Sequence, residues 1–600
     1  MIGVVAATAT GRAAAAALAE AWPGEVRPYT GERAAEGLRA AWRECEAVVA
    51  FLAVGATVRV LAPLLEHKTE DPAVVCVDEA RRYAVPVLGG HHGANTLAHR
   101  LADVLGCEPV ITTASDQGNV TALDSYGADL GFTVDNPDML ARVGAAVLSG
   151  DPVRLTGADD WPLPPLPPNV TPDADGPLTI HVTDEIPPPP GATAGRPSAA
   201  PPDAVAGRSG DALVGELDAG TDDGVLVYRP PSLVVGVGSA RGVTAEEVGG
   251  LVDVALEEAG LSPASVRCVA TVDLKADEEG ILVAARERGW EVVTHPASVL
   301  AAVDVPNPSE TVRAEVGTPS VAEAAALHTA RSHGRAATLV VTKRKTANAT
   351  VAVARLAPRG RLAIIGLGPG ARDLLTPRAV AALRRASVVV GLDQYVEQVR
   401  DLLRPGTRVL ASGLGQEEAR ARTAVQEAER GHAVALIGSG DAGIYAMASP
   451  ALEFAGDDIE VEGVPGITAA VAAANLLGAP LGHDHAYISL SDLHTPWEAI
   501  ERRIRAAAEG DFTVCFYNPR SRARDWQLPK ALAMLADHRP PGTPVGIVRN
   551  AGRPDQAVTV TTLGETDPAV VDMFTVVLVG SSRSRTVAGR FVTPRGYRWA

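Results

Sequence analysis

The stretch LAIIGLGPGARDLLTPRAV, residues 362–380, joins an apolar run to a glycine-rich loop and then to a helical pattern. Gly366, Gly368 and Ala371 satisfy the pattern G-x-G-x-x-G/A, and Asp393 follows at about the distance that a contact to a dinucleotide ribose needs. The pattern predicts a strand, a tight turn and a helix, which are the parts of an α/β sheet. Three alternatives are open for the loop: it binds NAD(P), it binds a different ligand, or it is a turn that binds nothing.

The helix after this loop is predicted to begin late. Thr376 is a good N-cap and Pro377 suits the first helical position, so residues 371–375 separate the loop from the helix. In a dinucleotide site the helix begins at the third glycine and directs its amino end at the pyrophosphate. Pro369 also removes one N–H donor from the loop. An NAD(P)-dependent oxidoreductase is therefore the less favoured alternative.

The composition indicates a large cytosolic α/β protein. The 600 residues suggest about four domains, and short apolar runs that alternate with helical patterns predict mostly parallel sheets. A formal net charge of −18 argues against a nucleic-acid surface. The five cysteines are scattered without a C-x-x-C pair, which favours a reducing cytosol over a disulfide framework or a zinc site. Gly55, Arg59 and Pro63 interrupt the longest apolar window, so no membrane span is expected.

The order of patterns along the chain predicts four segments. We expect α/β domains at residues 1–148 and 231–357, a Pro/Gly-rich region at 149–230, and a further unit at 361–600. Within the Pro/Gly-rich region a poorly ordered linker is expected at Ile186–Asp211, with short strands in LTIHVTD (178–184) and GVLVYR (224–229). In the segment that follows, Thr244 is expected to cap a helix and Glu247 to complete a capping box.

Four more clusters follow apolar strands in the last unit: GSGDAGIY (438–445), VPGITA (464–469), FYNPR (516–520) and VRNAG (548–552). Together with GLGPG they resemble the tetrapyrrole methyltransferase family, whose members use S-adenosylmethionine, and the resemblance covers residues 361–600. The stretch from GAPLGHDHAYISLSD to VGIVRNAGR resembles the branch that methylates carbon 17 of precorrin-3B or cobalt-factor III and contracts the ring in cobalamin biosynthesis. The resemblance implies a tetrapyrrole methylase fold with two lobes, about 361–482 and 483–600, a cofactor trough between them, and a homodimer formed through this unit.

The resemblance also implies which loop residues bind the cofactor. Glycines let main-chain groups approach a ligand closely, and Asp441 either accepts from the ligand or bonds its own backbone as a turn residue. The predicted cofactor-binding residues are Gly366, Gly368, Pro369, Gly370, Ser439, Gly440, Asp441, Ile444, Thr468, Ala469 and Asn518.

The residues predicted for catalysis and substrate binding lie in the second lobe. Methyl transfer needs mainly an in-line geometry, whereas ring contraction also moves protons. His483, Asp484 and Asp492 are the candidate acid/base or substrate-orienting groups, and the alternative for His483 is a structural hydrogen bond. The candidates for binding carboxylate arms of the tetrapyrrole are Arg520, Arg522 and Arg524, with a solvated basic loop as the alternative. The protein itself is expected to hold no metal, and any cobalt is expected to arrive with the substrate.

The N-terminal half carries a second resemblance. The stretch around Gly89-Gly-His-His-Gly-Ala-Asn95, together with residues 233–355, resembles the cobalt-precorrin-5A hydrolase family, which opens a lactone and releases acetaldehyde. The resemblance suggests His91 or His92 as the base, unless they only form a turn before a helix. Asn95 and the glycine backbone are candidate donors to the oxyanion, and Lys275, Lys343 and Lys345 are candidates for binding carboxylates.

These patterns predict a bifunctional enzyme with the hydrolase first and the methyltransferase second. Ser239 stands where many hydrolase members have a cysteine, so a thiol role is excluded at that position. An alternative therefore keeps the methyltransferase and makes the N-terminal half a non-catalytic binding or scaffold module.

Overall fold

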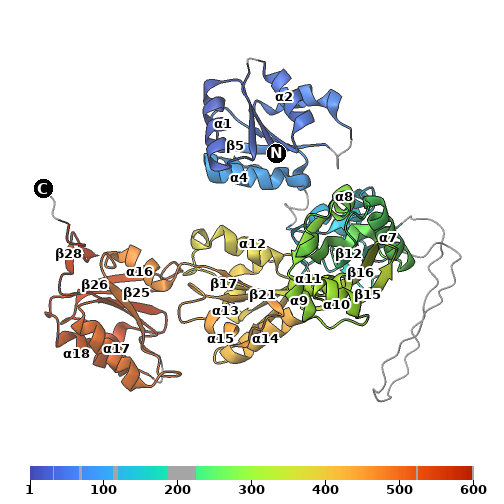
Figure 1. The fold of residues 1–600 in the computed structure, drawn as a ribbon. Coiled ribbons are helices and arrows are strands. Elements are labelled where there is room, and N and C mark those ends of the chain that lie inside the picture. Colours follow the sequence, from blue (N-terminus) through green and yellow to red (C-terminus); the bar gives the residue numbers. More distant parts are fainter. Residues whose placement is uncertain (32, 67–70, 113–118, 187–223, 522–523, 598–600) are drawn as a thin grey trace. The chain divides into compact units, whose positions relative to one another are not determined.

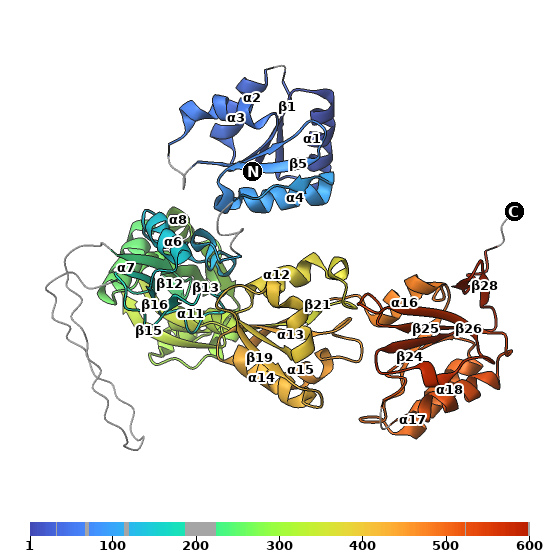
Figure 2. The ribbon, with the colours of Figure 1, turned by 180° about the vertical axis from the view of Figure 1, so that it is seen from behind.

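The computed structural model describes residues 1–31, 33–66, 71–112, 119–186, 224–521 and 524–597, without the side chains of His91 and His92. The chain divides into two compact units. The first contains residues 1–160, 164–358 and 404–406, and the second contains residues 161–163, 359–403 and 407–600. Sheets with helices packed on their faces recur along the chain, which confirms the predicted α/β class (Figures 1 and 2). Apart from Ile186, the linker predicted at 186–211 lies outside the described residues.

The first sheet has the strand order β2-β1-β3-β4-β5-β6. Its strands are β1 (Ile2–Ala6), β2 (Val26–Tyr29), β3 (Ala47–Phe51), β4 (Ala73–Val77), β5 (Tyr83–Leu88) and β6 (Glu108–Pro109). The helices that cover it are α1 (Ala9–Ala21), α2 (Ala34–Glu44), α3 (Val54–Leu61) and α4 (Asn95–Leu105). The first four strands are parallel, and β5 runs antiparallel to β4, with Leu88 opposite Val74. The apolar strand residues are buried between the helix layers, as expected for a parallel sheet.

A second, smaller sheet forms from the Pro/Gly-rich region and the residues before it. Its order is β7-β11-β10-β8-β9, from β7 (Thr133–Val134), β8 (Val153–Thr156), β9 (Val170–Thr171), β10 (Leu178–Val182) and β11 (Val225–Arg229), with α6 (Met139–Ser149) beside it. Both strands predicted here form, and they pair in parallel with Thr179 opposite Val225. The strands that precede and follow residues 187–223 in sequence are therefore adjacent in the sheet.

The third sheet has the order β14-β13-β12-β16-β15. Its strands are β12 (Leu233–Ser239), β13 (Val266–Val272), β14 (Glu291–His295), β15 (Ala336–Lys345) and β16 (Ala349–Ala357), and its helices are α7 (Ala245–Glu258), α8 (Glu279–Glu287), α9 (Ala297–Ala301), α10 (Glu310–Val316) and α11 (Val321–His333). The Thr244 hydroxyl accepts from the Glu247 N–H, as predicted. The predicted reciprocal half of the capping box is wrong, because the Glu247 carboxylate accepts from Thr346 and Asn348 in the turn between β15 and β16.

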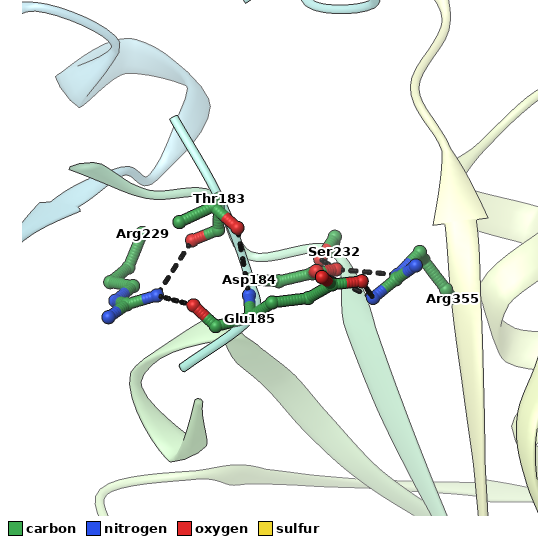
Figure 3. A network of polar contacts seen from close by, with 6 residues as sticks. All are labelled: Thr183, Asp184, Glu185, Arg229, Ser232 and Arg355. Carbon is green, nitrogen blue, oxygen red and sulfur yellow. Dashed lines mark hydrogen bonds and ion pairs between the residues drawn. The ribbon is translucent and has the colours of Figure 1, made fainter. Parts of the chain in front are cut away.

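A buried ionic network joins the second sheet to the third (Figure 3). Asp184, which is 8% exposed, accepts from Ser232 and from two nitrogens of Arg355, at 2.8 and 2.7 Å. Arg229, which is 4% exposed, donates to the carbonyls of Thr183 and Glu185. Because both buried charges are satisfied, the segment before residue 187 is fixed to both sheets.

The second unit contains a fully parallel lobe and a mixed lobe. The parallel sheet has the order β19-β18-β20-β17-β21 and the mixed sheet the order β23-β24-β27-β25-β26. The parallel lobe comprises β17 (Gly360–Gly366), β18 (Val388–Leu392), β19 (Arg408–Ser412), β20 (Ala433–Gly438) and β21 (Ile459–Val464), with α12 (Pro377–Arg385), α13 (Asp393–Val399), α14 (Glu417–Glu429) and α15 (Ala448–Phe454). The mixed lobe comprises β23 (His485–Ser489), β24 (Thr513–Tyr517), β25 (Pro544–Arg549), β26 (Ala557–Thr562) and β27 (Thr575–Val579), with α17 (Trp497–Glu509) and α18 (Gln527–Ala536).

Helix α16 (Ala469–Leu477) connects the two lobes of this unit. It follows β21 in sequence, yet its buried face packs on Cys515, Val548 and Leu578 of the mixed sheet. Strand β22 (Gly478–Ala479) follows α16 directly in sequence and forms a small sheet with β28 (Arg585–Val587) and β29 (Arg590–Val592). Among the helices of the described residues, none is long and apolar enough to cross a membrane.

Candidate active site

Two glycine loops at the carboxyl edge of the parallel sheet, one after β17 and one after β20, lie side by side and form a wall of backbone. Strands β17 and β20 are neighbours, and their last residues, Gly366 and Gly438, lie opposite each other. In the loops that follow, Gly368 N–H donates to the Gly440 carbonyl at 3.0 Å and Gly440 N–H donates to the Gly368 carbonyl at 2.7 Å. Both residues have left-handed backbones, with φ of 72° and 67°, which glycine adopts at little cost. The reciprocal bonds fix the two loops relative to each other.

The loop after β21 packs against this wall so closely that only glycine fits. A Cβ on Gly366 would lie 2.6 Å from the Gly440 carbonyl oxygen, and a Cβ on Gly466 would lie 2.1 Å from the same atom. Glycine at these two positions therefore allows the backbones of the loops to pack directly against each other. Gly366 stays a predicted cofactor residue, but the structure explains its presence without a ligand.

Asp441 connects the loops after β20 and β21. Its Oδ1 accepts from the N–H of Gly443 at 2.9 Å, and its Oδ2 accepts from the N–H of Gly466 at 3.0 Å. The first bond is the turn contact considered from the sequence, whereas the second spans two loops. A carboxylate has about four acceptor positions, so each oxygen keeps capacity for a ligand donor.

The helix that follows the first loop begins where the sequence predicts. Residues Arg372–Leu374 form a short 3₁₀ turn, and α12 begins at Pro377 with the Thr376 hydroxyl accepting from the Ala379 N–H at 3.2 Å. The amino end of α12 is therefore separated from Gly368 and is not directed at a ligand in this loop. This geometry is unlike a dinucleotide site.

Arg553, which was not predicted from the sequence, contacts both loops from the mixed lobe. Its Nε donates to the Pro369 carbonyl at 2.8 Å, and its Nη2 donates to the Ser439 hydroxyl at 3.0 Å. Its side chain lies over Gly370, where φ is 136° and a Cβ would come within 2.6 Å of Arg553 Cγ. The signal in the sequence that could have identified it is a positively charged residue directly after the VRNAG cluster.

Three of the nine tyrosines gather where the two lobes meet. The ring centroid of Tyr517 lies 5.3 Å from that of Tyr445 and 5.7 Å from that of Tyr487. The Tyr445 hydroxyl donates to the Tyr487 carbonyl at 2.7 Å, and Tyr445 holds a strained left-handed backbone with φ of 53°. Burial raises the pKa of all three phenols, so they are neutral at physiological pH. None of the three was predicted from the sequence.

Tyr517 also caps helix α16. Its hydroxyl accepts from the Ala470 N–H at 3.0 Å and bonds the Thr468 hydroxyl at 2.5 Å, whereas the Thr468 side chain makes no cap bond of its own. Thr468 and Ala469 are predicted cofactor residues, so the helix end that carries them is positioned by a side chain of the other lobe.

The carboxyl ends of β23, β24 and β25 lie at one edge of the mixed sheet, because β24 and β25 are both antiparallel to β27. Asn518, with φ of 48°, donates to the Ser489 hydroxyl at 3.2 Å. Asp492 follows β23 and accepts from Gln527 at 3.1 Å, and its side chain is 40% exposed. The structure therefore brings Asn518 and Asp492 to the same edge.

The predicted arginine cluster is held by protein acceptors. Arg524 is 9% exposed, lies 3.9 Å from Asp492 and donates to the Asn518 carbonyl at 2.8 Å. Burial lowers the pKa of Arg524. Arg520 donates to the carbonyls of Pro568 and Ala569, and Arg522 lies outside the described residues. Arg520 and Arg524 thus order this loop, which differs from a solvated basic loop.

His483 and Asp484 lie at the opposite end of β23 from Asp492. Both precede the strand, and a strand of five residues spans about 16 Å. His483 Nδ1 accepts from the Asp484 N–H at 2.8 Å, and the two side chains are 44% and 79% exposed. The structure does not bring the three predicted acid/base groups together.

In the first unit, the GGHHGAN segment lies at the amino edge of the parallel strands. Because β5 runs antiparallel to β4, its end at Leu88 is level with the start of β4. Residues Gly90–Ala94 form one π-helical turn, and α4 begins at Asn95. The side chains of His91 and His92 lie outside the described set, so their role as a base stays a prediction.

The predicted lysines lie on the third sheet and contact protein acceptors. Lys275 follows β13 and its Nζ lies 3.3 Å from Glu278, whereas Lys343 on β15 donates to the Asn307 carbonyl at 2.8 Å. Burial by itself would raise the pKa of Glu278, but bonds from Gly242 N–H and Lys275 hold it below its usual value. Strands β12 and β16 separate β13 from β15, so the two lysines do not form one cluster.

The fold of residues 361–600 is that of a two-lobed α/β enzyme in which glycine loops of one lobe meet side chains of the other. The family model described as Tetrapyrrole (Corrin/Porphyrin) Methylases matches residues 361–567, and the chain belongs to this family. Models described as Cobalamin synthesis G N-terminal and Cobalamin synthesis G C-terminus match residues 36–116 and 233–354. Both resemblances found in the sequence are confirmed.

Individual relatives agree with this assignment. A probable cobalt-factor III C(17)-methyltransferase of Salmonella typhimurium is 47% identical over 239 residues, which are 39% of this chain and 99% of that protein. A cobalt-factor III methyltransferase of Priestia megaterium is 42% identical over 40% of this chain and 46% of its own length. A precorrin-3B C(17)-methyltransferase of a Sinorhizobium species is 40% identical over 38% of this chain and 91% of its own length. The chain thus spans nearly all of two relatives and about half of the third.

Proposed function

We propose that residues 361–600 transfer a methyl group from S-adenosylmethionine to carbon 17 of precorrin-3B or cobalt-factor III, with contraction of the ring. We further propose that the cobalamin synthesis G domains open the lactone of cobalt-precorrin-5A and release acetaldehyde. The main support for the methyltransferase is the wall formed by Gly368 and Gly440 in a chain that spans 99% of a C(17)-methyltransferase relative.

The residues present fit S-adenosylmethionine, which supplies a methyl group on a sulfonium when bound. Gly368, Gly370 and Gly440 all have φ between 67° and 136° and carry no side chain, so a ligand can closely approach the main-chain donors and acceptors of these loops. An adenine, a ribose and an amino-acid group need such main-chain donors and acceptors. The residues that would hold the cofactor are Pro369, Ser439, Gly440, Asp441, Ile444, Thr468, Ala469 and Asn518.

The side chains around the wall orient and shield the substrate. Tyr445, Tyr487 and Tyr517 offer neutral aromatic surface beside the cofactor loops, which suits the flat face of a macrocycle. Asp492 is the predicted acid/base group at the same edge as Asn518, so we assign it the proton transfers. His483 and Asp484 are given no role in that step because they lie beyond the other end of β23.

For the first unit, a non-catalytic binding or scaffold role is the second candidate. It is favoured by the position of the GGHHGAN turn at the amino edge, because ligands of open α/β sheets usually bind at the carboxyl edge. A full-length chain with His91→Ala and His92→Ala decides between the two. The hydrolase proposal expects loss of acetaldehyde release with methyl transfer unchanged, and equal release from the variant contradicts a role for these histidines.

The cofactor is tested by titration calorimetry on the full chain. Tight binding of S-adenosylhomocysteine with no response to NAD(P) is expected, and the reverse result would remove the methyltransferase proposal. We also place the protein in the cytosol, since all five cysteines are free and buried, and expect a homodimer by light scattering.

A further inference from the structure

Among the described residues, Arg553 is the one side chain of the mixed lobe that is hydrogen-bonded to both glycine loops. It comes from the mixed lobe and bonds two loops of the parallel lobe, at the Pro369 carbonyl and at the Ser439 hydroxyl. These loops follow β17 and β20, the strands whose loops are already joined through Gly368 and Gly440. The guanidinium therefore contacts the two glycine loops of the predicted cofactor site from the mixed lobe, which carries the predicted substrate-binding residues.

The bonding geometry requires arginine. Nε and Nη2 lie on the same edge of the planar guanidinium and serve two acceptors at once, at 2.8 and 3.0 Å. A lysine carries its three donors on one nitrogen at the end of a flexible stem, so it holds either acceptor but does not fix both in one plane. Arginine is thus needed for orientation as well as for charge.

The backbone packs closely around the Arg553 side chain, both in its own turn and in the loop after β17. Arg553 leaves a turn in which its N–H donates to the Asn550 carbonyl at 3.0 Å, and Asn550 has a strained φ of 52°. Gly552 lies next to it, where a Cβ would come within 3.2 Å of the Pro369 ring. On the other loop, a side chain at Gly370 would collide with Arg553 Cγ. The turn that carries Arg553 and the loop after β17 therefore lie in close contact.

We propose that Arg553 is a positioning residue for methyl transfer, which sets the cofactor loops in register with the substrate lobe. This inference rests on the proposed methyltransferase function. Since Arg553 acts through Pro369 and Ser439, its loss is expected to weaken cofactor binding and to misalign the methyl group. The KM for the tetrapyrrole is expected to change little, because its predicted binding residues follow other strands.

The test compares Arg553→Lys and Arg553→Gln with the full-length wild type. Loss of a charge-assisted bond corresponds to at least about a tenfold weaker Kd for S-adenosylhomocysteine. We expect that loss together with a fall in kcat, while the tetrapyrrole KM stays near the wild-type value. Ser439→Ala removes one of the two acceptors and is expected to give a smaller loss, and adding Arg553→Lys to it should cost less than in the wild type. Arg505→Lys, on the outer helix α17 and paired with Glu501, is the matched control.

The outcomes separate two failures. If the wild type does not bind S-adenosylhomocysteine, the proposed function is wrong. If the wild type binds and both Arg553 variants bind equally well, the positioning role is wrong. A fall in Tm and kcat together with a rise of the KM values for both substrates in Arg553→Lys would also overturn the proposal, because it marks an arginine that only stabilises the fold.

Discussion

Tyr517→Phe tests how the mixed lobe holds the start of helix α16. The hydroxyl accepts from the Ala470 N–H and bonds Thr468, so its removal leaves a helix-end donor and a 6%-exposed Thr468 hydroxyl without these partners. Each unmade bond of this kind costs about 1–3 kcal/mol, and a helix cap about 0.5–2 kcal/mol. We therefore expect the C-terminal unit to lose roughly 2–4 kcal/mol. For a unit of this size, that is a fall in Tm of about 4–16 °C.

The assay is thermal unfolding of the full chain, followed with and without S-adenosylhomocysteine so that the transition of the C-terminal unit is identified by its ligand shift. Tyr487→Phe is the control, because its ring lies in the same cluster while its hydroxyl bonds nothing in the described residues. A Tyr517→Phe transition that coincides with that of Tyr487→Phe would refute the capping argument.

The same tyrosine predicts a pH dependence. The folded pKa of Tyr517 is raised above its ordinary value of 10.0, first by burial. The unfolded chain ionises this phenol near pH 10 while the folded chain does not, so its contribution is complete below pH 10 and is lost as the pH rises above it. The wild-type transition is expected to fall above pH 10 more steeply than that of Tyr517→Phe.

Four further substitutions test other parts of the structure. Asp441→Ala should weaken S-adenosylhomocysteine binding by about tenfold or more, since two loops lose their shared acceptor; calorimetry measures it, and an unchanged Kd contradicts the role. Asp184→Ala should lower the stability of the N-terminal unit by about 1–3 kcal/mol in urea, because Arg355 and the buried Ser232 hydroxyl lose an acceptor, while methyl transfer continues. Asp492→Asn should reduce kcat by about 100-fold or more and His483→Ala by less than about threefold; steady-state kinetics decides, and the opposite ranking moves the proton chemistry to the other end of β23.

Local features of the fold were predictable from the sequence. Thr376 and Pro377 set the start of α12 through contacts within a few residues, and Thr244 caps α7 for the same reason. The partner of Glu247 was not predictable, because the turn that contains Thr346 is about one hundred residues away in sequence. Tertiary contacts of that range leave no local pattern.

Residues of the candidate site were likewise predictable where they belong to a local pattern, and not where they depend on long-range contacts. Asp441 and the glycines belong to recognisable loop patterns, whereas Arg553 acquires its meaning only when the folding of two lobes brings it to Pro369, 184 residues away. The separation of His483 from Asp492 was predictable, since an apolar five-residue strand lies between them. The edge at which the GGHHGAN turn lies was not, because it depends on β5 running antiparallel.

The central claim is methylation of carbon 17 with S-adenosylmethionine as the donor. The most direct measurement supplies the full-length chain with this donor and, in parallel, precorrin-3B and cobalt-factor III, and identifies the products by mass spectrometry and NMR. We expect one added methyl group at carbon 17 on a contracted ring from at least one of the two substrates. Methylation at another carbon, or no methylated product from either substrate in a chain that binds S-adenosylhomocysteine, would contradict it.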